Sequence, residues 1–152
     1  MFSRQEIKII KEETEQFFEK LNFVVDFKIS SEQEVLYLKL KTEEPRVLIG
    51  ERGKVLAEIQ RLLRAILIRK LKRIFYLDLD INDYKQKKTH YLKEVAKEMA
   101  DKVVLGQKEI MLPAMSAYER RIIHLELSAR EDVTTESLGR EPERRIVIRP
   151  FP

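Results

Sequence analysis

One stretch of the sequence, residues 47–71, restricts the fold more than any other. A short apolar run leads into a tetrapeptide with a glycine at each end, Gly50-Glu51-Arg52-Gly53, and then into a long helical pattern. Glycines just before a helix N-terminus let the backbone approach a ligand, and the N–H groups of the first turn favour an anion. We therefore expect Gly50 and Gly53 to present free amides to a phosphate. The apolar residues of the helical pattern share one face: Leu56, Ile59, Leu63, Ile66 and Leu67.

The class of this glycine loop follows from its length. A P-loop needs four residues between its glycines and a following Gly-Lys-Ser/Thr, and a dinucleotide-binding fingerprint needs a third glycine. A G-x-x-G between two helical segments is instead similar to the phosphate-clamping loop of a KH domain, which holds a few nucleotides of single-stranded nucleic acid. A helix–helix turn that merely needs glycine is the alternative explanation of the same tetrapeptide.

Positive charge is concentrated on the loop and the helix after it. The chain has 30 basic and 26 acidic residues, a net charge of +4, yet residues 46–73 hold nine basic residues against two acidic ones. A region of one sign beside a phosphate-binding loop favours a polyanion as partner. The carboxylate of Glu51 opposes such binding. The expected phosphate contacts are Arg52 and Lys54, with Arg46, Arg61 and Arg64 as helpers.

Composition excludes several other classes. The sequence has no cysteine, which rules out disulfides, thiolate metal sites and cysteine catalysis and is typical of a reducing compartment. No apolar run reaches the length of a membrane span, and the N-terminus has no apolar signal region. We expect a cytoplasmic protein without membrane insertion.

Hydrophobic periodicity predicts the elements of the first half. Ser3 and Glu6 form a capping box that starts a helix, residues 3–20. Alternating apolar residues predict three strands, and a short helix precedes the glycine loop. Three strands with one apolar face need helices packed on that face. The order of these helices and strands resembles that of a type II KH domain over residues 3–81. The predicted elements after the first helix are strands 23–30, 35–41 and 74–81 and helices 43–49 and 54–72.

Residues 82 and 83 mark the expected boundary between a domain of residues 1–82 and a domain of residues 83–152. A long helix begins at Asp83, and Gly106 is expected as the glycine just beyond its end. The second half reads as two helices on a three-stranded sheet, so the whole chain is α+β. Its expected elements are helices 83–105 and 114–129 and strands 108–113, 133–137 and 145–149. The expected core positions of the long helix are Tyr91, Val95, Met99 and Val103.

The second helix of that half carries another candidate site. Arg120 and His124 are four residues apart and share one helix face. We expect both to be exposed, with Arg121 at the edge, while the opposite side packs into the core. The expected core side is Tyr118, Ile122, Leu125 and Ala129. Ile123 and Leu127 are left on the exposed side with Arg120 and His124, where they either bury against the first domain or form an apolar contact site. A surface helix whose arginine and histidine are merely solvated would have the same spacing.

Around that pair, SAYERRIIHLEL followed by GREPERRIVIRP resembles the R-three-H domain, a small nucleic-acid-binding module named for its arginine and histidine. A KH domain that runs directly into this module resembles the Jag/KhpB family of bacterial RNA-binding proteins. Family members commonly begin with a further small N-terminal domain and a linker, so the resemblance implies a short or trimmed homologue. It also implies that Gly50, Gly53, Arg120 and His124 contact nucleic acid. With the charge pattern, the candidate interface is Gly50, Glu51, Arg52, Gly53, Lys54, Arg61, Arg120, Arg121 and His124.

The function that follows is binding of single-stranded RNA, with single-stranded DNA as the other polymer, and without a cofactor, metal or small-molecule substrate. The resemblance further implies a small KH-only partner protein and a regulatory role in cell-envelope, division or sporulation control. A metal-dependent nuclease is an alternative, because His90 and Glu94 are spaced as metal ligands, although no third ligand is placed by the sequence. A protein-interaction adaptor that uses Ile123 and Leu127 as an apolar contact is the other alternative.

Overall fold

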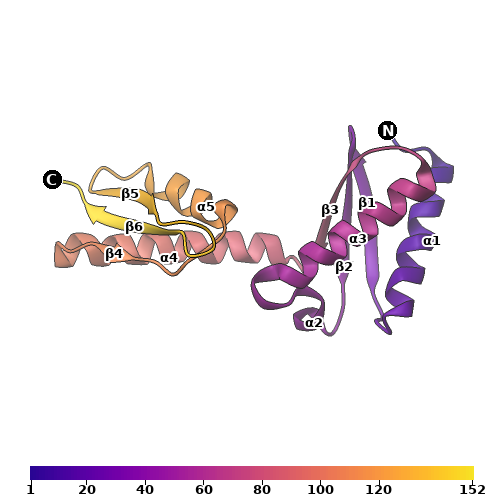
Figure 1. Ribbon diagram of the computed structural model, residues 1–152, viewed down its shortest axis with the longest axis horizontal. Helices are drawn as coiled ribbons and strands as arrows, with labels where there is room; N and C mark the ends of the chain where they lie inside the picture. The colour runs from indigo at the N-terminus through magenta and orange to yellow at the C-terminus, as the bar shows by residue number, and fades with distance from the viewer. The chain divides into compact units, whose positions relative to one another are not determined.

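The computed structural model describes residues 1–152 as two compact units, Met1–Lys85 and Gln86–Pro152 (Figure 1). Each unit has its own three-stranded sheet and its own hydrophobic core. The α+β class predicted from the sequence is confirmed. None of the helices has an apolar stretch of the length that a membrane span requires.

Unit 1 has the element order predicted for a type II KH domain. Strands β1 and β2 pair antiparallel, with Phe27 opposite Leu40, and β2 pairs parallel with β3. A parallel neighbour requires a crossover connection, and here the crossover contains the glycine loop. The elements are α1 (Arg4–Lys20), β1 (Asp26–Glu32), β2 (Val35–Lys41), α2 (Pro45–Ile49), the 3-10 turn η1 (Glu51–Gly53), α3 (Lys54–Leu71) and β3 (Tyr76–Ile81).

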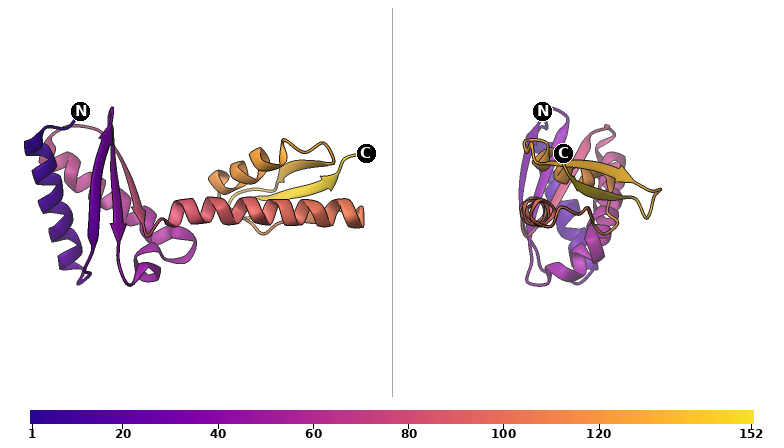
Figure 2. Two further views of the ribbon diagram at one scale, coloured as in Figure 1. Left: turned by 180° about the vertical axis from the view of Figure 1, so that it is seen from behind. Right: turned by 90° about the vertical axis from the view of Figure 1, so that its left-hand side faces the viewer.

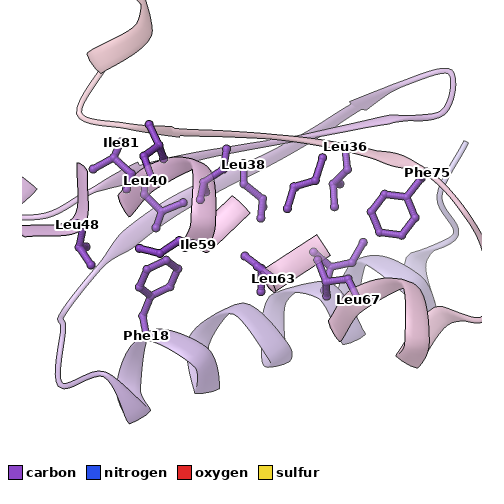
Figure 3. Packing of buried hydrophobic residues seen from close by; sticks show 14 of the residues in the cluster. Phe18, Leu36, Leu38, Leu40, Leu48, Ile59, Leu63, Leu67, Phe75 and Ile81 are labelled. Carbon is purple, nitrogen blue, oxygen red and sulfur yellow. The ribbon is translucent and has the colours of Figure 1, made fainter. Parts of the chain in front are cut away.

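The core of unit 1 lies between the sheet and the helices α1 and α3, as Figure 3 shows. Alternation along β2 and β3 directs every second side chain toward this layer. The buried residues of the two strands are Leu36, Leu38, Leu40, Leu77, Leu79 and Ile81. On α3, Leu56, Ile59, Leu63 and Leu67 are buried as predicted, and Ile66 is half-buried. The Ser3–Glu6 capping box that starts α1 is also present. Because α3 packs its apolar stripe on the sheet, its other face and its N-terminus are exposed beside the glycine loop.

Helix α3 also covers the outer edge of β3 with side chains. The Gln60 amide oxygen accepts a 3.0 Å hydrogen bond from the Leu79 N–H, and the Arg64 Nε donates a 2.8 Å bond to the Phe75 carbonyl. Unpaired backbone groups on a sheet edge invite pairing with another chain, and these bonds occupy two of them. Arg64 is therefore used within the fold and also lies over the Tyr76 ring, 5.8 Å from its centroid.

Unit 2 places two helices on one face of an antiparallel sheet with the order β4-β6-β5. Figure 2 shows the β5–β6 hairpin running alongside α4. The centre of the sheet is β6, where Ile148 lies opposite Thr135 on one side and Ile110 on the other. The elements are α4 (Tyr84–Gly106), β4 (Ile110–Met111), α5 (Ala117–Leu127), β5 (Val133–Leu138) and β6 (Arg145–Pro150).

Helix α4 departs from the sequence prediction in two respects. Of the predicted core positions Val103 is buried, but Tyr91 is exposed, and the other buried positions are Leu92, Ala96 and Ala100. The two sets have similar spacing along the helix, so periodicity alone does not choose between them. Gly106 is the last helical residue, and the left-handed backbone that ends the helix occurs at Gln107, with φ 49°.

Candidate nucleic-acid interface

The glycine loop has the backbone geometry of a tight reversal between α2 and α3. Gly50 has φ 72° and ψ −179°, a conformation that is essentially restricted to glycine. A Cβ at this position would lie 2.3 Å from a methyl group of Val55, so a side chain is also excluded sterically. Arg52 and Gly53 both have left-handed backbone, with φ 55° and 75°. The loop therefore needs its first glycine on two independent grounds.

The expectation of free amides on both glycines is wrong. The Gly50 N–H donates a 2.9 Å hydrogen bond to the Arg46 carbonyl and ends α2, while the Gly53 N–H donates a 3.3 Å bond to the Gly50 carbonyl. The Lys54 N–H likewise donates to the Glu51 carbonyl. The glycines therefore shape the reversal, and their own amides are used within it. The loop therefore offers a ligand its exposed side chains, and not the amides of its two glycines.

Two of those side chains, Arg52 and Lys54, are cationic, and one, Glu51, is anionic. Arg52 and Lys54 are exposed and form no ion pair, and Lys54 is the first residue of α3. Cations at a helix N-terminus are unfavourable for the helix itself, because the macrodipole is positive there. Helices α1 and α5 each begin with a serine and a glutamate in a capping box, whereas α3 has no side-chain cap and no acidic residue in its first turn. The N-terminus of α3 thus combines backbone and side-chain positive charge without an internal anion, apart from the nearby Glu51.

Much of the remaining positive charge of residues 46–73 is used inside unit 1. Arg73 binds Glu6 and Glu34 and lies 4.3 Å from the centroid of the Phe2 ring, and Lys70 pairs with Glu13 at 3.3 Å. The two carboxyls that bind Arg73 have lowered pKa values: for Glu6 the main cause is the backbone hydrogen bond from Ser3, and for Glu34 it is the hydrogen bond from Arg73. The exposed cations of this region without an ion pair are Arg46, Arg52 and Lys54 at the loop, and Arg69 and Lys72 at the far end of α3.

Arg61, a predicted helper, lies on the exposed side of α3. Its guanidinium is 3.4 Å from the Glu58 carboxylate, one turn earlier, and both side chains are well exposed. An exposed pair of this kind contributes little stability and separates easily. Arg46 is also exposed and forms no ion pair. Of the five basic residues predicted around the loop, Arg64 is held by a hydrogen bond to the backbone, and Arg61 has only its exposed pair with Glu58.

In unit 2, the face assigned to α5 from the sequence is wrong. Ile123 and Leu127, expected on the exposed side, are buried in the core. The side expected to be buried is largely in solvent: Tyr118 is 65% exposed, Leu125 is 57% exposed, Ala129 is exposed and Ile122 is half-buried. The helix is thus rotated relative to the prediction, with Arg120, Ile123 and Leu127 on its buried side.

Arg120, expected in solvent, turns inward and is only 8% exposed. One guanidinium nitrogen donates a 2.6 Å hydrogen bond to the Glu141 carboxylate, and another donates a 2.6 Å bond to the Met115 carbonyl. A buried guanidinium needs such partners, because an unpaired buried charge is very costly. Arg120 is occupied within the fold, and the expectation of an exposed Arg120 is wrong.

His124 and Arg121 lie on the solvent side of α5. The Nδ1 atom of His124 is 2.6 Å from the Thr135 hydroxyl on β5, which leaves Nε2 for an outside partner. Arg121 is exposed and forms no ion pair. The exposed aromatic ring of Tyr118 lies one turn before Arg121. Together these residues present a cation, an imidazole and an aromatic ring on one side of one helix.

A buried carboxylate fixes the start of α5. Glu119 accepts a 2.9 Å hydrogen bond from the Ser116 N–H and forms an ion pair with Lys88 on α4. Burial by itself would raise the pKa of Glu119, but the hydrogen bonds from Lys88 and Ser116 outweigh it and the pKa is lowered. Glu119 thus stays ionised and joins the two helices. The Ser116-x-x-Glu119 capping box was readable from the sequence and marks the true start of the helix.

No group of three or more His, Asp or Glu side chains is arranged to hold a metal ion. His90 and Glu94 are both exposed on α4, and no third ligand joins them.

Comparison with known proteins defines the class. Residues 90–150 match the R-three-H domain family, so the chain is a two-unit α+β protein that carries an R-three-H domain. The chain is 32% identical over 136 residues to RNA-binding protein KhpB of Clostridium symbiosum, and 35% identical over 111 residues to RNA-binding protein KhpB of Streptococcus pneumoniae. It is also 30% identical over 125 residues to RNA-binding protein KhpB of Bacillus subtilis. The chain belongs to the KhpB (Jag) family, as the sequence motifs indicated.

These alignments cover most of this chain but only part of the relatives. The three matches include 88%, 73% and 81% of this chain, and they include 61%, 34% and 60% of the respective relatives. The chain therefore spans less than two thirds of the length of the curated relatives it matches.

Proposed function

We propose that this chain binds single-stranded RNA through two surfaces, the glycine loop of unit 1 and the exposed side of α5 in unit 2. The observation that carries the proposal is the N-terminus of α3, where Arg52 and Lys54 are exposed and unpaired and no internal acid caps the helix. The names of the relatives, which describe RNA-binding proteins, support the same conclusion.

In unit 1, the sugar-phosphate backbone passes over the reversal at Gly50–Gly53. The glycines allow the tight reversal, Arg52 and Lys54 neutralise phosphates, and Arg46 adds charge. Contacts to phosphates carry no sequence information, so the binding is tolerant of base sequence. A KH fold holds about four nucleotides in this way.

In unit 2, Arg121 is the phosphate contact and His124 offers Nε2 to a phosphate or a base. Arg120 is not a direct contact in this proposal, because its guanidinium is already bonded to Glu141 and Met115. The adaptor alternative loses its basis, since Ile123 and Leu127 are core residues.

The test is a fluorescence-anisotropy titration of the full chain with a labelled RNA of roughly 12 nucleotides, longer than one KH groove holds. Parallel titrations use single-stranded DNA and an RNA duplex of the same length. Lys54→Glu is compared with Lys11→Glu, which makes the same charge change at an exposed residue of α1 that forms no ion pair.

We expect Lys54→Glu to weaken RNA binding about tenfold. Reversing one contact at about 4 Å in water removes about 1 kcal/mol of attraction and adds a similar repulsion before salt screening. Lys11→Glu should change the affinity less than twofold. Equal losses in the two variants would mean that only net charge matters, and tighter binding of duplex RNA would contradict the single-strand proposal.

A further inference from the structure

The Arg120–Glu141 pair joins two parts of unit 2 that are distant in sequence. Arg120 lies in the second turn of α5, and Glu141 lies in the loop between β5 and β6. Their side chains meet at 2.6 Å, with the Arg120 side chain 9% exposed and the Glu141 side chain 57% exposed. The arginine is thus the buried partner, and the glutamate reaches in to it from the surface.

The same loop is attached to the start of α5 at a second point. The Met115 N–H donates a 3.2 Å hydrogen bond to the Arg144 carbonyl, while the Met115 carbonyl accepts the second bond of Arg120. Arg120 therefore bonds both to the loop, through Glu141, and to Met115, the residue before the N-cap of α5. Without Arg120, the loop would be held to this part of the helix chiefly by the single backbone bond between Met115 and Arg144.

The loop attached in this way is rich in cations. Arg140 is exposed and forms no ion pair, and Arg144 donates a 2.8 Å hydrogen bond to the Gly139 carbonyl. Neither guanidinium is neutralised by a carboxylate. Their position beside α5 depends on the attachments described above.

We infer that Arg120 is a positioning residue, which with Glu141 holds the loop of residues 139–144 against α5 so that Arg140 and Arg144 join Arg121 in binding RNA phosphates. This inference rests on the proposed function, because it assumes that unit 2 binds RNA. It divides the Arg-x-x-x-His pair into two roles: His124 faces the ligand, and Arg120 shapes the surface from within.

Glu141→Gln tests the inference, because the two possible roles of Arg120 predict opposite signs. If Arg120 were itself a phosphate contact, removing the Glu141 charge would free it and would remove a repulsive carboxylate, so RNA binding would stay equal or become tighter. If Arg120 positions the loop, the same change weakens binding although the protein becomes more positive. Glu143→Gln is the matched control, since Glu143 lies in the same loop, is exposed and forms no ion pair.

We expect Glu141→Gln to weaken binding of the single-stranded RNA at least threefold, and to reduce the slope of log K against log salt by up to about 1.4. The slope is about 0.7 for each phosphate contact to a single strand, and two arginines are displaced. Glu143→Gln should leave the slope unchanged and should not weaken binding. Equal or tighter binding by Glu141→Gln overturns the inference.

A second measurement uses the unmodified protein and so does not depend on how any variant folds. Arginine Nε–H signals are followed by NMR while the single-stranded RNA is added. The signals of Arg121, Arg140 and Arg144 should move, while that of Arg120 stays near its free position. Movement of Arg120 equal to that of Arg121, or no movement of Arg140 and Arg144, overturns the inference. If the protein binds no RNA in either experiment, the proposed function itself fails.

Discussion

Replacing Gly50 by alanine should destabilise unit 1 far more than the same change at Gly53, although both glycines belong to one loop. At Gly50 the backbone has φ 72° and ψ −179°, and a residue held in this glycine-only region costs on the order of 1–3 kcal/mol. The new Cβ would also lie 2.3 Å from the Val55 Cγ2 and 2.9 Å from its Cβ, an overlap that costs about 1–3 kcal/mol more. The expected loss is therefore about 2–6 kcal/mol.

Gly53 provides the internal comparison. Its φ of 75° and ψ of 16° lie in the ordinary left-handed region, where an alanine costs roughly 1–2 kcal/mol. The nearest atom to its added Cβ would be Cε1 of Tyr84, at 3.1 Å, which is tight but can yield. We expect Gly53→Ala to cost about 1–2 kcal/mol.

A second substitution separates the two causes at Gly50. Val55→Ala removes the methyl group that lies closest to the new Cβ and leaves the backbone strain in place. The double variant Gly50→Ala, Val55→Ala should therefore recover about 1 kcal/mol relative to Gly50→Ala alone, a coupling that independent sites would not show.

Native-state hydrogen exchange of the full chain is the assay, because the two units need not unfold together. The amides of Leu63 and Leu67, whose side chains are fully buried, report the opening of unit 1. Each step of about 1.4 kcal/mol corresponds to about a tenfold faster exchange. If Gly50→Ala accelerates exchange no more than Gly53→Ala, the described loop geometry is wrong.

Three further predictions concern charge. Glu51→Gln should tighten binding of single-stranded RNA about threefold in an anisotropy titration, because repulsion between the Glu51 carboxylate and a phosphate at roughly 6 Å in water costs about 0.7 kcal/mol. Weaker binding would mean that the phosphate does not lie beside Glu51. Arg121→Ala should lower the salt slope of binding by about 0.7, and an unchanged slope would exclude it as a phosphate contact. The pKa of Glu119 is lowered in the folded protein, so its ionised form stabilises unit 2 at pH values above the ordinary pKa of 4.5, and this stability is lost as the pH falls through the folded pKa. In an acid titration, Glu119→Gln should therefore lose unit 2 stability less steeply than the unmodified protein. Identical pH profiles would refute this.

Unit 1 was predictable from the sequence because its signals are local and mutually consistent. The Ser3–Glu6 capping box starts α1, and period-2 alternation marks β2 with its bounds as observed. The apolar stripe of α3 is wide and strictly periodic, so only one face of the helix can pack on the sheet. These local signals agree with the fold, which is the condition under which pattern reasoning works.

Helix α5 was misjudged because apolar residues occur on both of its sides. Ile122 and Leu125 fit one apolar face as well as Ile123 and Leu127 fit the other, and periodicity cannot choose between them. The choice is made by tertiary partners: Ile123 and Leu127 meet the sheet, and the buried Arg120 finds Glu141 across 21 positions of sequence. A pairing over that distance leaves no trace in local spacing.

The charge pattern showed where cations are in excess, but it could not show which of them are paired with acids inside the fold. The excess of cations around the glycine loop was correctly located, but Arg73 and Lys70 are neutralised by acids that come from other segments, including Glu6 and Glu13. Likewise, glycine spacing identified the loop but could not show that the Gly50 and Gly53 amides are used to build the reversal. Hydrogen-bond partners of this kind depend on the folded backbone.

The most direct test of the account is a map of backbone amide shifts as single-stranded RNA is added to the full chain. If RNA binds at the two proposed surfaces, the largest changes lie at Gly50–Lys54 and on the exposed side of α5 around Arg121 and His124. Changes confined to the open face of the unit 1 sheet, around Lys28 and Lys39, or no changes at saturating RNA, would contradict it.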